Sequence, residues 1–70
     1  MKLSTRDQLP GTVVSVVLGE AMAVVKIKLD SGEQVITSSI TRDAAIDLGL
    51  AEGSPVVALV KSTEVAIGVE

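Results

Sequence analysis

Two short polar stretches lie near opposite ends of this 70-residue chain, and each combines one cation with hydroxyl side chains. Residues 4–9 include Ser4 and Arg6, and residues 61–64 include Lys61 and Ser62. Arginine offers a planar fork of donors, lysine a compact charge and serine a short adjustable donor. Such donors, with no paired base or nucleophile, suit holding a small tetrahedral oxyanion and do not suit breaking a bond. The two stretches therefore predict an anion-binding site and no enzymatic activity.

The sequence around these stretches is typical of β-strands with one short helix between them. Apolar and polar residues alternate most clearly in residues 21–29, and the helical period appears in residues 41–48, with Gly49 as its stop. We expect five strands, at residues 12–18, 21–29, 34–40, 56–61 and 65–69. This order predicts an all-β fold with one short helix, a five-stranded, partly closed barrel resembling an OB-fold.

The length and composition indicate a single domain, residues 1–70, that is too small to bury all of its apolar surface. A chain of this size buries only about 60% of its unfolded surface. Hydrophobic residues make up 47% of the sequence, yet it has no aromatic residue, no Cys and no His. Disulfides, thiolate or imidazole metal sites, and Cys or His catalysis are thereby excluded. We expect part of the aliphatic surface to be buried between subunits of a homo-oligomer.

The charge of the chain argues against two classes of partner. The net charge is −3 and the sequence pI is about 4.7, so general attraction to nucleic acid or to anionic lipid is not expected. No leader-like apolar run follows the first residues, and no apolar run is long enough to cross a bilayer. The sequence therefore predicts a soluble, cytoplasmic protein.

Three motifs, in order and spaced over essentially the whole chain, also carry a family resemblance. They are Ser4-x-Arg6-Asp7-Gln8-Leu9-x-Gly11, then Ile40-Thr41 with Leu48-Gly49-Leu50-x-x-Gly53, and last Val60-Lys61-Ser62-Thr63-Glu64-Val65. Together they resemble the motifs of the molbindins, small molybdenum-pterin-binding proteins built from a single TOBE-type domain.

The resemblance implies non-catalytic binding of molybdate, and of tungstate, for intracellular storage. It implies a barrel that shares strands between subunits of a hexamer, a trimer of dimers, with the ligand at subunit interfaces. Carried over by position, Ser4, Arg6, Lys61 and Ser62 correspond to the main oxyanion contacts. Thr41 corresponds to a contact made from the neighbouring subunit.

Purely structural interpretations of the same residues remain open. Arg6 could be a surface residue paired with Asp7 or Glu64, and Lys61 could be a strand-end residue with its charge in solvent. Thr41 could be the N-cap of the short helix, and this role is compatible with a nearby anion.

Asp7 departs from the family pattern, which usually has Asn after the Arg. An aspartate cannot donate a hydrogen bond, and it adds negative charge, so we expect it to point away from a ligand. In an extended segment Ser4 and Arg6 would share one face, and Thr5 and Asp7 the other.

Three other functions compete with oxyanion storage. Asp7 favours a structural, oligomerising TOBE-like module with a degenerate anion site. An OB-like nucleic-acid-binding domain would use aromatic stacking and a basic groove, and the sequence provides neither. A pterin ligand would likewise find no aromatic ring to stack on.

Overall fold

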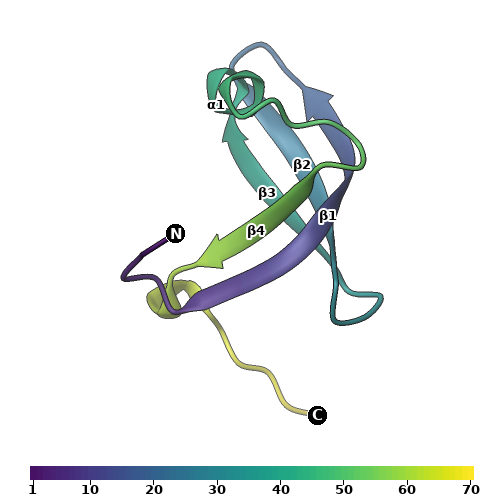
Figure 1. Ribbon diagram of the computed structural model, residues 1–70. Coiled ribbons are helices and arrows are strands. Elements are labelled where there is room, and N and C mark those ends of the chain that lie inside the picture. The colour runs from purple at the N-terminus through teal and green to yellow at the C-terminus, as the bar shows by residue number, and fades with distance from the viewer.

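The structure is a computed structural model of all 70 residues, and most of its regular secondary structure is β-sheet. Its elements are β1 (Asp7–Leu18), β2 (Met22–Leu29), β3 (Val35–Thr41), α1 (Arg42–Asp47), β4 (Pro55–Val60) and the 3₁₀ turn η1 (Ser62–Glu64). The strands form one antiparallel sheet in the order β3-β2-β1-β4. The sheet curls into a half-barrel, with α1 at one end and both η1 and the N-terminal segment at the other (Figure 1). The predicted all-β class with one short helix is confirmed.

Strand β1 organises the sheet because it pairs with two partners in succession. Residues 7–12 pair with β4, and residues 11–18 pair with β2. The register with β2 shifts between Val13 and Ser15, so Val14 forms a β-bulge. A bulge bends the strand and increases its twist, which curls the sheet. The sequence predicted this strand from residue 12, whereas β4 provides partners that extend it back to Asp7.

Gly11 lies where β1 is shared by both partner strands, and it allows a close approach of the chains. A Cβ added there would lie 2.6 Å from the Lys28 carbonyl oxygen and 2.7 Å from Ile27 Cγ2. Gly11 is paired with Leu29 on one side and with Val56 on the other. Only a residue without a side chain fits this crossing.

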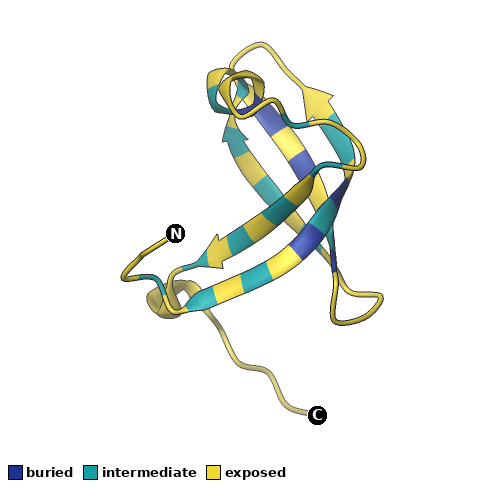
Figure 2. Ribbon diagram, viewed as in Figure 1, coloured by how far each residue is buried: buried dark blue, intermediate teal, exposed yellow.

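The core of the single chain is small and purely aliphatic. It is built from Val13, Val25, Ile27 and Leu29, and partly buried side chains pack around it. The alternation predicted for β2 is confirmed, since every second residue from Ala23 to Leu29 is buried (Figure 2). Only seven of the 70 residues are buried, and many large apolar side chains remain exposed. The single chain therefore leaves the surplus of aliphatic surface that the composition predicts.

The short helix α1 is fixed at both ends by local chemistry. The Thr41 hydroxyl accepts a hydrogen bond from the Ala44 backbone N–H at 3.1 Å, which confirms the predicted N-cap. Gly49 follows the helix with φ of 64°, a conformation that favours glycine. Arg42 also donates from Nη1 to the Gly19 carbonyl at 3.0 Å, and so ties the helix to the turn between β1 and β2.

The predicted fifth strand, residues 65–69, is not formed in the single chain, whose sheet has four strands. After η1 the chain leads away from the sheet (Figure 1). Ile67 is 90% exposed and Val69 is 92% exposed. The η1 turn takes the chain out of line with β4, so these residues meet no strand with which to pair their backbone groups. An apolar, alternating sequence is not enough to form a strand without a partner.

The close approach at Gly11 makes this position intolerant of any side chain. We expect Gly11→Ala to lower the free energy of unfolding by about 1–3 kcal/mol, the usual cost of overpacking. Urea unfolding at a fixed protein concentration measures the change. Gly32→Ala is the matched control, because no atom lies within 4 Å of an added Cβ there. Equal stability of the two variants would contradict the close approach.

Candidate anion-binding site

A hollow of about 240 Å³ lies at the end of the half-barrel opposite α1, and polar side chains alone line it. The lining residues are Ser4, Thr5, Arg6, Lys61, Ser62 and Thr63. Two cations and four hydroxyls therefore converge from segments more than 50 residues apart in the chain. The two polar stretches singled out in the sequence line one hollow.

The pairing of β1 with β4 explains why the two stretches meet. The last pair of this antiparallel ladder is Asp7 with Val60. Arg6 directly precedes Asp7, and Lys61 directly follows Val60, so the two cations lie side by side where the ladder ends. Like charges at opposed positions repel each other. An anion between them would replace this repulsion with attraction.

The segment after β4 is shaped by η1. Lys61 has extended backbone dihedral angles, and the chain then turns through Ser62–Glu64. The Glu64 N–H donates to the Lys61 carbonyl at 2.9 Å, and the Val65 N–H donates to the Ser62 carbonyl at 3.4 Å. These bonds shape the backbone that carries Lys61, Ser62 and Thr63, and all three residues line the hollow.

Neither cation of the site is neutralised by a carboxylate. The one ion pair of the structure joins Lys28 to Glu33 at 3.7 Å, on the solvated face of β2. Arg6 pairs with neither Asp7 nor Glu64, so the surface-pair interpretation of Arg6 is wrong. Asp7 is half-buried, and it does not line the hollow. This placement agrees with the expectation that the Asp7 carboxylate points away from a ligand.

Thr41 lies apart from the other four residues predicted for the site. It ends β3, pairs with Met22 and caps α1, which is at the opposite end of the half-barrel (Figure 1). The single chain therefore brings together Ser4, Arg6, Lys61 and Ser62 and leaves Thr41 outside. Its hydroxyl accepts from Ala44 and retains its own proton for donation.

Thr5 and Thr63 also line the hollow, and the sequence had not singled them out as site residues. Thr5 lines the same hollow as Arg6, whereas the sequence placed them on opposite faces of an extended segment. Residues 4–6 lie outside β1, and the chain bends at Ser4. The alternation of an extended strand does not apply to a bend. The sequence did contain a signal for both residues, because each threonine belongs to the same polar stretch as one of the two cations.

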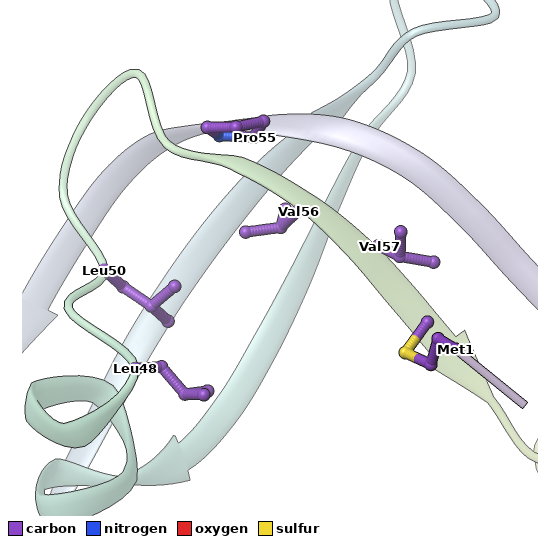
Figure 3. Close-up of a pocket in the computed structure, with 6 residues that line it drawn as sticks. All are labelled: Met1, Leu48, Leu50, Pro55, Val56 and Val57. Atoms are coloured by element: carbon purple, nitrogen blue, oxygen red, sulfur yellow. The ribbon is translucent and has the colours of Figure 1, made fainter. Parts of the chain in front are cut away.

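The other two large hollows of the molecule are apolar. One of about 460 Å³ is lined by Leu48 and Leu50 after α1, by Pro55, Val56 and Val57 of β4, and by Met1 (Figure 3). The other, of about 360 Å³, lies between β3 and β4 on the concave side of the sheet, and 11 of its 13 lining residues are hydrophobic. Neither presents a charged side chain, so the polar hollow is the one suited to an anion.

The polar hollow offers mainly hydrogen-bond donors and positive charge. Arg and Lys side chains have no acceptor, and Ser and Thr hydroxyls adjust to either role. No group of three or more His, Cys, Asp or Glu residues is placed to hold a metal ion. No helix of the structure is long and apolar enough to cross a membrane. The two cations and the hydroxyl-bearing residues of the hollow supply the donors that a small anion requires.

Comparison with known proteins identifies the family. The TOBE domain model matches residues 3–67. Molybdenum-pterin-binding protein 3 of Clostridium pasteurianum is 43% identical over 67 residues, which cover 96% of this chain and 97% of the relative.

Two solved structures share the fold at similar length. MopII from Clostridium pasteurianum has a TM-score of 0.90 at 38% identity and covers 97% of this chain and 100% of its own. A molybdate-binding protein from Sporomusa ovata has a TM-score of 0.88 at 37% identity and covers 96% of this chain and 97% of its own. With the motifs and the fold in agreement over nearly its whole length, the chain belongs to the TOBE domain family, among the molybdenum-pterin-binding proteins, or molbindins.

Proposed function

We propose that this protein binds molybdate, and the similar oxyanion tungstate, without changing it chemically. The observation that carries the proposal is the convergence of Arg6 and Lys61, both free of acidic partners, on a hollow lined with hydroxyls. The Sporomusa relative is a molybdate-binding protein with the same fold. The local concentration of donors provides an anion site within a chain whose net charge is −3.

The donor set matches the needs of a tetrahedral dianion. Two cations balance its double charge, and charge-assisted hydrogen bonds are roughly twice as strong as neutral ones. The four hydroxyls can each donate one further bond. Selection against sulfate, which has the same charge and shape, would come from the size of the cavity.

We further propose that the site is completed at an interface between subunits. Five of the six lining residues are exposed in the single chain, so an anion there would be held from one side only. Thr41, remote from the hollow within its own chain, is then the contact supplied by a neighbouring subunit. Binding would be coupled to assembly, and ligand would raise the stability of the oligomer by mass action.

The proposed assembly is a homohexamer, a trimer of dimers, whose subunits share the segment that follows η1. Val65, Ile67 and Val69 alternate along this exposed segment. Strands β3 and β4 are the edges of the sheet, and an apolar groove lies between them. An unpaired edge beside such a groove can accept a strand from another chain. The fifth strand predicted from the sequence would then form between subunits.

The proposed role is storage of the oxyanion in the cytoplasm. A site made of donors alone can take up and release its ligand unchanged. The sequence has no cysteine, so its stability requires no disulfide and no oxidising compartment. Fractionation of cells that express the protein, followed by molybdenum analysis of each fraction, tests both the compartment and the cargo.

The double variant Arg6→Ala with Lys61→Ala tests the site. We expect molybdate binding, measured by isothermal titration calorimetry, to weaken about a hundredfold or more, because two charge-assisted contacts are lost. Lys26→Ala with Lys28→Ala is the matched control, since it removes the same charge from β2. Unchanged binding in the site variant would mean that the site assignment is wrong. Absence of binding by the wild type would instead favour a structural module with a degenerate site.

Asp7→Asn tests the influence of the one residue that departs from the family pattern. Asp7 lies outside the hollow but next to Arg6, so its charge should act on the anion only through space. We expect about a twofold to fivefold gain in molybdate affinity at low salt, which should disappear as ionic strength rises. A gain that is independent of salt would instead indicate direct contact between residue 7 and the ligand.

Ile67→Asp tests the shared segment. A charge at this 90% exposed position should not disturb the single chain, but it should be strongly disfavoured in an apolar groove of a neighbour. We expect native mass spectrometry to show smaller species in place of hexamers. Gly32→Asp, which adds the same charge at an open hairpin tip, is the control. Hexamers that persist in Ile67→Asp would exclude this mode of assembly.

A further inference from the structure

The two halves of the anion site are held in place very differently. The half that contains Lys61 and Ser62 is fixed by the two backbone hydrogen bonds of η1. The half that contains Ser4 and Arg6 lies in residues 1–6, which precede β1 and make no backbone–backbone hydrogen bond. A segment of this kind is expected to fray unless something else holds it.

One hydrogen bond does hold the N-terminal half. The side-chain amide of Gln8 donates from Nε2 to the carbonyl oxygen of Thr5 at 2.7 Å. It is the only hydrogen bond of the structure that involves any of residues 1–6. The Thr5 carbonyl lies between the two predicted ligands, Ser4 and Arg6, so the bond acts on the backbone that carries both.

Gln8 is itself well anchored. It is the second residue of β1 and is paired with Leu59 of β4, so the ladder fixes its backbone. Its side chain is exposed and does not line the hollow. Gln8 is therefore not among the residues that face the hollow, and the one hydrogen bond of its side chain is to residue 5.

We propose that Gln8 is a positioning residue for the anion site, an inference that rests on the proposed function. By holding the Thr5 carbonyl, it keeps residues 4–6 turned toward residues 61–63 before the ligand arrives. A preorganised site spends less of its binding energy on ordering its own groups. Without this bond, part of the affinity is used to order the N-terminal segment.

The test compares the full-length wild-type protein with Gln8→Met and Gln8→Asn. Methionine keeps the length of the side chain without the donor, and asparagine keeps the amide but is one methylene too short to reach. We expect molybdate binding to weaken about twofold to tenfold in both variants, the range for loss of one hydrogen bond. Because Arg6 and Lys61 remain, the dependence of affinity on salt should be unchanged. Gln34→Met, in the exposed turn before β3, is the matched control.

A second readout requires no ligand. In ¹⁵N relaxation of the ligand-free variants, the order parameters of the Thr5 and Arg6 amides should fall below about 0.6, from about 0.85 in the wild type. Those of Ser62 and Thr63 should not change. A general loss of structure would lower both sets together, so this contrast separates positioning from destabilisation.

The outcomes are distinguishable. Wild-type affinity in both Gln8 variants, or equal order of residues 5 and 6 in variant and wild type, overturns the role of Gln8 and leaves the proposed function intact. Absence of molybdate binding by the wild type overturns the proposed function, and the relaxation data alone then decide whether Gln8 holds the segment. Weaker binding together with local disorder supports the proposal.

Discussion

The antiparallel pairing of β1 with β4 is the constraint on which the site depends. It joins the start of the chain to its end and fixes Asp7 opposite Val60, so the residues just beyond this pair face each other. The backbone ladder places Arg6 and Lys61 next to each other, and their own side chains make no hydrogen bond or ion pair that contributes to this. The repulsion between them is tolerated because both side chains are exposed to water. The fold thus supplies two adjacent positive charges at a fixed place, and the hydroxyl-bearing residues beside them follow from the same register.

The rest of the fold supports this pairing with a very small hydrophobic core. The chain has no aromatic residue, so its core consists of valine, isoleucine and leucine side chains inside the curled sheet. The bulge at Val14 and the absence of a side chain at Gly11 allow β1 to bend and to pair with both β2 and β4. Because the core is small, many large apolar side chains stay exposed on the single chain. Both observations support the proposed assembly, in which one chain would cover the apolar groove of another.

Local features were predictable from the sequence, and features that depend on partners were not. The alternation in β2, the Thr41 cap and the stop at Gly49 are encoded within a few residues, and all three are confirmed. The early start of β1 depends on β4, nearly 50 residues away, and the absence of a strand at residues 65–69 depends on what lies beside them. In the site, four of the five predicted residues meet in the single chain. Thr5 also lines the hollow, which the sequence did not predict, because a bend at Ser4 replaces the strand that the alternation assumed.

None of the six residues around the polar hollow belongs to a strand or to the buried core. The chain segments that carry them begin where the ladder stops. Side chains can therefore be exchanged at these positions with little risk to folding. Under the proposed function, recognition and architecture are encoded by separate sets of positions, so one scaffold can be adapted to different anions.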